Sequence, residues 1–173
     1  MIHFNNLKSK IIMENQNELV VKMVFDAWNN QQKTANKLLE TLTDEQLQQD
    51  VAAGKNSGIY LLGHLTSVHD DMHRILNFGA KLYPDLDAPF IKSADKSGQE
   101  FPSATLLRKY WNDVNNSLTN HFGKLNSNDW FTRHMSVSEE DFAKEPHRNK
   151  LNIIINRTNH MAYHLGQMTL LKK

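Results

Sequence analysis

Apolar residues recur every three or four positions in four long stretches of the chain, which is the spacing of one face of an α-helix. No stretch alternates apolar and polar residues over a useful length, as a half-buried strand would. The first stretch covers about residues 16–42. The face of it that we expect to be buried carries Val20, Val24, Ala27, Gln31, Thr34 and Leu38. The pattern therefore predicts an all-α protein.

Capping residues indicate where the other three long helices begin and end. Ser57 is a suitable N-cap for a helix over about residues 57–78, and Ser103 for a helix that ends at Gly123. The last helix is expected over about residues 149–171. Four helices of this kind predict an antiparallel four-helix bundle.

The remaining segments are expected to be irregular. Residues 83–101 are rich in Pro, Asp and Gly and form a connection much longer than usual between helices, so we expect a mobile loop that borders a pocket. Residues 126–148 are expected to hold one short helical turn, around residues 138–142. Residues 1–15 are interpreted as an N-terminal extension, and residues 16–173 as one domain.

Composition narrows the classes of function. The chain has 20 basic and 19 acidic residues and a net charge of +1, which argues against nucleic acid or an anionic membrane as a partner. It has no cysteine, which excludes disulfide frameworks, zinc ribbons and thiol nucleophiles of its own. Its first residues lack the continuous apolar run of a secretion signal or a membrane span, so a cytoplasmic location is predicted.

Three histidines are expected to face the core from two helices. His160 and His164 lie four residues apart, about 40° around a helix and one turn along it, so one metal ion could bind both. His64 shares a face with Leu61 and Val68 and also points inward. Because antiparallel packing would bring His64 level with the pair, the spacing predicts a shared metal site between facing helices.

Other interpretations of these histidines remain open. A pair of histidines one turn apart is more often structural than metal-binding. The residue after His160 is Met161, where a zinc protease of the His-Glu-x-x-His type has its glutamate base, so that class is disfavoured. His69 and His73 fall on the opposite side of their helix from His64 and are interpreted as surface residues.

Two motifs carry a resemblance to a known family. They are Ser57-Gly-Ile-Tyr-Leu-Leu-Gly-His64-Leu and Asn159-His160-Met-Ala-Tyr-His164-Leu-Gly-Gln167, and with the order of the helices they resemble the DinB-like, YfiT-like family of metal-dependent enzymes. The resemblance implies a four-helix bundle, often a homodimer, in which His64, His160 and His164 bind nickel or zinc. Relatives include thiol S-transferases and isomerases that use low-molecular-weight thiols.

The function hypothesis combines this site with that chemistry: a divalent metal activates a small thiol for S-transfer. A metal-dependent hydrolase and a non-catalytic metal-binding stress protein are the alternatives. No catalytic residue beyond the ligands is assigned. The side chains that we expect to orient the ligands or contact a substrate are Gln31, Asp71, Tyr163 and Gln167.

A possible dimer interface lies on the last helix. Ile155, Gly166 and Leu170 project away from His160, so they pack either against a partner chain or within the bundle.

Overall fold

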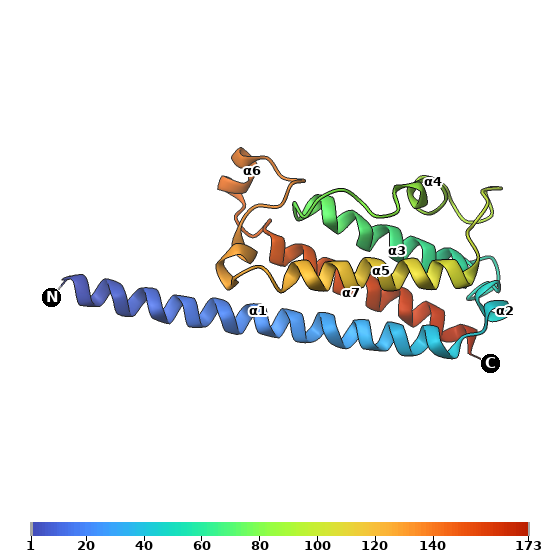
Figure 1. Cartoon of the computed structure of the whole chain (residues 1–173), viewed down its shortest axis with the longest axis horizontal. Coiled ribbons are helices and arrows are strands. Elements are labelled where there is room, and N and C mark those ends of the chain that lie inside the picture. Colours follow the sequence, from blue (N-terminus) through green and yellow to red (C-terminus); the bar gives the residue numbers. More distant parts are fainter. Residues whose placement is uncertain (1, 173) are drawn as a thin grey trace.

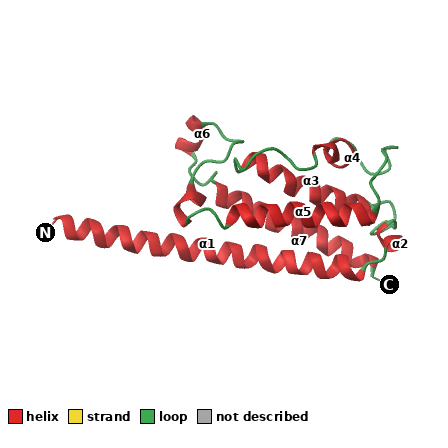
Figure 2. Cartoon of the chain, viewed as in Figure 1, coloured by secondary structure: helices red, strands yellow, loops and turns green. Residues whose placement is uncertain are grey.

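Four long helices make up most of the protein (Figure 1), and the computed structural model describes residues 2–172, with the side chains of residue 13 and residues 15–172. The long helices are α1 (Ile2–Thr41), α3 (Gly58–Ile75), α5 (Ala104–Phe122) and α7 (Lys150–Met168). The short helical elements are α2 (Asp44–Leu47), η1 (Pro84–Leu86), α4 (Asp87–Phe90), η2 (Ser127–Phe131), α6 (Glu139–Lys144) and η3 (Thr169–Leu171). Figure 2 shows no strand in the described range, so the predicted all-α class is confirmed.

The predicted N-caps begin their helices as expected. In each case a side-chain oxygen accepts a hydrogen bond from a backbone N–H in the first turn, which satisfies a donor that the helix itself leaves unpaired. The capping residues are Ser57, Ser103, Ser138 and Asn149.

The predicted start of the first helix near residue 16 was wrong. Helix α1 runs without interruption from Ile2, because the sequence holds neither glycine nor proline before Thr41. Its N-terminal part reaches beyond the ends of the other long helices (Figure 1).

The buried face of α1 is also rotated from the predicted one. Ala27 and Thr34 are exposed, although both were expected inside. The buried residues on this helix are Trp28, Ala35, Leu38, Leu39 and Leu42. The chain offers two adjacent rows of apolar side chains, and the row with the large Trp28 ring is the one that buries more area.

The directions of the long helices decide which residues can meet. Helices α1 and α7 run in one direction and α3 and α5 in the other (Figure 1). Helix α1 packs along α7, and α3 packs along both α5 and α7. The segment between α3 and α5 returns the chain to the end where α3 begins. Helices α3 and α7 are therefore antiparallel neighbours.

Two connections hold more structure than expected. The segment over residues 83–101 contains η1 and α4, and Pro84 stands at the first position of η1, where its fixed φ favours a helical turn. Within residues 126–148, α6 confirms the predicted turn, while η2 was missed. Asn126 and Asp129 start η2 with a capping box, a sequence signal that could have identified it.

None of the helices in residues 2–172 is both long enough and apolar enough to cross a lipid bilayer.

Candidate metal centre

The antiparallel helices α3 and α7 bring the three predicted histidines together. His64 lies about two turns into α3, and His160 and His164 lie in the second half of α7. Nε2 of His160 is 3.2 Å from Nε2 of His64 and 3.0 Å from Nε2 of His164. All three rings are half-buried. The spacing argument from the sequence therefore predicted which histidines meet.

The distances between these nitrogens suit one shared metal ion. Ligand nitrogens at about 2.1 Å from an ion are about 3.0 Å apart when the bonds to the ion are perpendicular, and about 3.4 Å apart in a tetrahedron. One nitrogen from each of the three histidines lies within 4.8 Å of the other two. The group could hold a divalent ion with positions left for other ligands.

Hydrogen bonds fix the orientation of two of the rings. Nδ1 of His64 lies 2.9 Å from the backbone oxygen of Phe90, and Nδ1 of His164 lies 2.8 Å from Oε1 of Gln167. Because both oxygens can only accept, each Nδ1 carries the proton and each Nε2 keeps its lone pair. Metal-binding histidines commonly have such a partner behind them.

His160 completes the donor set but is held differently. Its Nδ1 is buried and has no hydrogen-bond partner within the described part of the chain. If Nε2 of His160 carries a proton, it can donate a hydrogen bond to His64 or to His164 but not to both. A cation, in contrast, could accept the Nε2 lone pairs of all three rings. The residues present therefore fit a metal ion.

Burial and mutual repulsion favour the neutral form of His160 and His164. Burial, followed by the charges of His164, His64 and Arg157, lowers the pKa of His160 to about 4. Burial also lowers the pKa of His164, although the hydrogen bond with Gln167 opposes this. Neutral imidazole is the form that binds metal, so proton competition at neutral pH is weak.

The segment between α3 and α5 forms one side of the site. The Phe90 carbonyl of this segment contacts His64, and its Ser93 carbonyl accepts a hydrogen bond of 2.9 Å from the Tyr60 hydroxyl. The Tyr60 ring in turn stacks on the His64 ring, with the ring centroids 6.2 Å apart. Gly63 makes this approach possible, because a methyl group there would overlap the Phe90 ring. The prediction that this segment borders the site is confirmed, and its mobility stays a prediction.

The predicted supporting residues divide into those near the ligands and those elsewhere. Gln167 orients His164, as expected. Tyr163 is 64% exposed and accepts a hydrogen bond of 3.3 Å from Gln167. The prediction that Asp71 orients a ligand was wrong, because its two carboxylate oxygens accept hydrogen bonds from Arg74 at 3.0 and 3.1 Å. Gln31 is half-buried on α1, and no hydrogen bond joins it to a ligand ring among the described residues.

The interpretation of His69 and His73 as surface residues was wrong. They are 0% and 2% exposed. The ring of His69 lies between those of Trp28 and Trp111, with ring-centroid distances of 5.0 and 4.9 Å. The helical wheel placed the two histidines opposite His64 correctly, but that side of α3 faces α5 rather than solvent.

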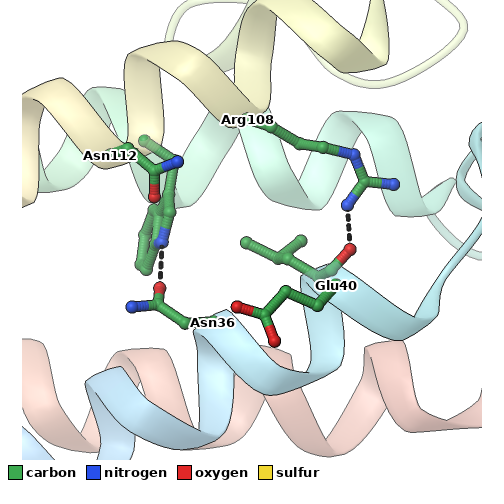
Figure 3. A pocket seen from close by; sticks show the side chains of 6 residues that line it. Asn36, Glu40, Arg108 and Asn112 are labelled. Carbon is green, nitrogen blue, oxygen red and sulfur yellow. Dashed lines mark hydrogen bonds between the residues drawn. The ribbon is translucent and has the colours of Figure 1, made fainter.

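In a cleft between α1 and α5, Arg108 and Trp111 of α5 each form a hydrogen bond with α1 (Figure 3). The Arg108 guanidinium donates to the Leu42 carbonyl at 2.7 Å, and Trp111 Nε1 donates to Asn36 Oδ1 at 2.8 Å. Arg108 thereby pairs a carbonyl at the C-terminal end of α1, as basic residues near helix ends commonly do. This cleft is structural and lies apart from the histidines on α3 and α7.

Fold and site together define an all-α protein with a three-histidine group that could hold a metal ion. The chain belongs to the DinB superfamily, whose sequence model matches residues 27–168. No curated protein matches the chain.

Proposed function

We propose that this protein is a metal-dependent enzyme in which His64, His160 and His164 bind one nickel or zinc ion that activates a low-molecular-weight thiol for S-transfer. The observation that carries the proposal is the convergence of three Nε2 atoms, two of them oriented by hydrogen bonds at Nδ1. Membership of the DinB superfamily supports a metal site in this place.

In this proposal the four long helices form the four-helix bundle typical of the family, with α3 antiparallel to α7. The predicted all-antiparallel arrangement was wrong, because α1 packs parallel to α7 and α3 parallel to α5. The opposite directions of α3 and α7 support the proposed bundle, because they bring the ligands to one level (Figure 1).

The histidines act as ligands rather than as acids or bases. A divalent ion held by them supplies Lewis acidity, which lowers the pKa of a coordinated thiol or water. The Phe90 carbonyl and Gln167 keep His64 and His164 in the tautomer that presents Nε2. Phe90, packed on Gly63, shields the His64 side from water.

The proposed partners are a small-molecule substrate and a second copy of the chain, with no nucleic acid or membrane. Ile155 and Leu170 are 41% and 61% exposed, and nothing in the described structure lies within 4 Å of a methyl group built on Gly166. Exposed apolar side chains on one helix support a homodimer. A cytoplasmic location fits the proposal, since the cytosol keeps small thiols reduced.

Two measurements in sequence test the function. Elemental analysis of untagged protein purified without chelators should find about one nickel or zinc per chain, and His64→Ala should lose it while His147→Ala, a change at an exposed histidine, keeps it. A screen of thiols with electrophiles should then find S-transfer that requires the metal.

The outcome also separates the alternatives. Metal-dependent hydrolysis without thiol transfer would favour the hydrolase, and bound metal without any turnover would favour a non-catalytic metal-binding stress protein. Absence of bound metal after exposure to nickel and zinc would contradict all three.

A further inference from the structure

Arg157 is a half-buried cation that lacks a partner next to the proposed metal site. It lies on α7, one helical turn before His160. Its Nε is buried and has no hydrogen-bond partner among the described residues. Burial lowers the pKa of Arg157, and the charge of Asp71 opposes this only in part. A partly buried cation that forms no ion pair favours an anionic ligand.

The cleft in front of Arg157 has room for a small molecule. Its volume is about 450 Å³, within the usual range for ligand sites. It is lined by Ser67, Val68, Asp71, Arg74, Lys81, Asp87, Ile91 and Arg157. None of the three histidines lines the cleft. Its Val68 follows His64 by one turn of α3, and the charge of Arg157 acts on His160, so we infer that the cleft adjoins the histidine site.

The other two cations of the cleft are already neutralised. Arg74 donates to both oxygens of Asp71 at 3.0 and 3.1 Å. Lys81 forms an ion pair with Asp87, which also accepts a hydrogen bond of 2.6 Å from Ser67. A cleft with one unpaired guanidinium and two paired carboxylates suits a ligand with one negative charge better than a dianion such as a phosphate.

We propose that Arg157 binds a carboxylate of the substrate, while the thiol of the same molecule reaches the three histidines. This inference rests on the proposed function and adds the substrate class: small thiols that carry a carboxylate close to the sulfur. The planar guanidinium can donate two parallel hydrogen bonds to a carboxylate, which also sets the direction of the thiol.

Calorimetry with two matched thiols tests the assignment on the metal-loaded protein. The probes are 3-mercaptopropionate and 3-mercaptopropanol, which differ in the carboxylate. Wild-type protein should bind the carboxylate probe about tenfold or more tightly, the ratio expected from one charge-assisted contact. Arg157→Gln should remove this preference, and Arg157→Lys should keep part of it. Arg148→Gln is the control, because it removes a paired cation that lies outside the cleft.

The possible results separate the subsite from the metal chemistry. Equal binding of the two probes to wild type, or an unchanged preference in Arg157→Gln, would overturn the subsite even if metal and thiol still bind. Propionate and propanol titrated into metal-free protein supply the complementary measurement. A preference for propionate that depends on Arg157 would support the subsite even if the metal function failed. Metal content, measured for every variant, shows whether the histidines remain intact.

Discussion

Helix α3 carries two groups of buried histidines on different sides, and only one has the features of a binding site. His64 faces α7, where its Nε2 approaches those of His160 and His164. His69 and His73 face α5 and are more deeply buried than His64.

The two groups differ in what their nitrogens contact. Nδ1 of His69 donates to Asn115 Oδ1 at 2.9 Å, and Nε2 of His73 is 2.9 Å from the Ser117 hydroxyl. Nδ1 of His73 also contacts Asp70, and Nε2 of His69 is buried without a partner among the described residues. The nitrogens of these two rings do not belong to a group that could share a metal ion. Burial alone therefore does not identify a functional histidine, because a core imidazole with a hydrogen-bond partner is a stable structural element. Converging lone pairs distinguish the candidate metal centre.

Replacing His160 with Ala should give the largest effect in this comparison, a loss of metal affinity. Apparent zinc binding of about 10–16 kcal/mol over four ligands implies about 2.5–4 kcal/mol for each, so metal affinity should fall by roughly a hundredfold to a thousandfold. Competition with a chromophoric chelator measures this. The free energy of unfolding of the metal-free protein should fall by only about 1 kcal/mol, since His160 loses no hydrogen bond at Nδ1 and at most one at Nε2. Retention of wild-type affinity would exclude His160 as a ligand.

His69→Ala should produce the reverse pattern. It leaves a cavity between Trp28 and Trp111 and removes a partner of Asn115, so the free energy of unfolding should fall by about 2–3 kcal/mol. Urea denaturation monitored by circular dichroism gives this value. Metal affinity should stay within about threefold of wild type, because His69 is outside the donor set. A large loss of metal would show that the two groups act as one site.

Two glutamines allow a finer test. Gln167 orients His164, whereas Gln32 donates to Asn115 at 2.6 Å, behind His69. Gln167→Ala should weaken metal binding about tenfold, as loss of such a supporting contact commonly does. Gln32→Ala should leave metal affinity unchanged and lower stability by about 1 kcal/mol. Equal metal affinities of the two variants would contradict a supporting role for Gln167.

Local signals predicted the starts of α3, α5 and α7 and the three histidines of the candidate metal centre. Ser57 and Asn149 fix where α3 and α7 begin, and regular helical geometry then determines which way His64, His160 and His164 point. These features depend on a few residues close together in sequence, which explains why they could be recognised.

Features that depend on distant packing were missed. The environment of His69 depends on α5 packing against α3, although the absence of charged residues from Gly58 to His69 was a signal that α3 is buried on more than one side. The support for His64 comes from the backbone oxygen of Phe90, and a backbone group has no sequence signature. Arg157 could have been noticed as a cation one turn from His160, but its lack of a partner could not.

The smallest expected effect lies in the pH dependence of the free energy of unfolding, which tests the environment of His69. Burial lowers the pKa of His69 to about 3. The hydrogen bond with Asn115 opposes this shift, and the charges of Arg157, His160 and His64 add to it. The ordinary pKa of histidine in an unfolded chain is about 6.5, so below neutral pH the unfolded state takes up a proton that folded His69 does not. Stability is therefore lost as the pH falls from about 7 towards 3.

Between pH 7 and pH 6, His69 alone should lower the free energy of unfolding by about 0.7 kcal/mol. The free energy of unfolding of metal-free protein in urea should accordingly decrease less in His69→Gln than in wild type over that interval. Groups that do not interact with His69 contribute equally to both proteins, so the difference reports mainly on His69. Identical pH slopes would mean that the pKa of His69 is the same in the folded and unfolded states.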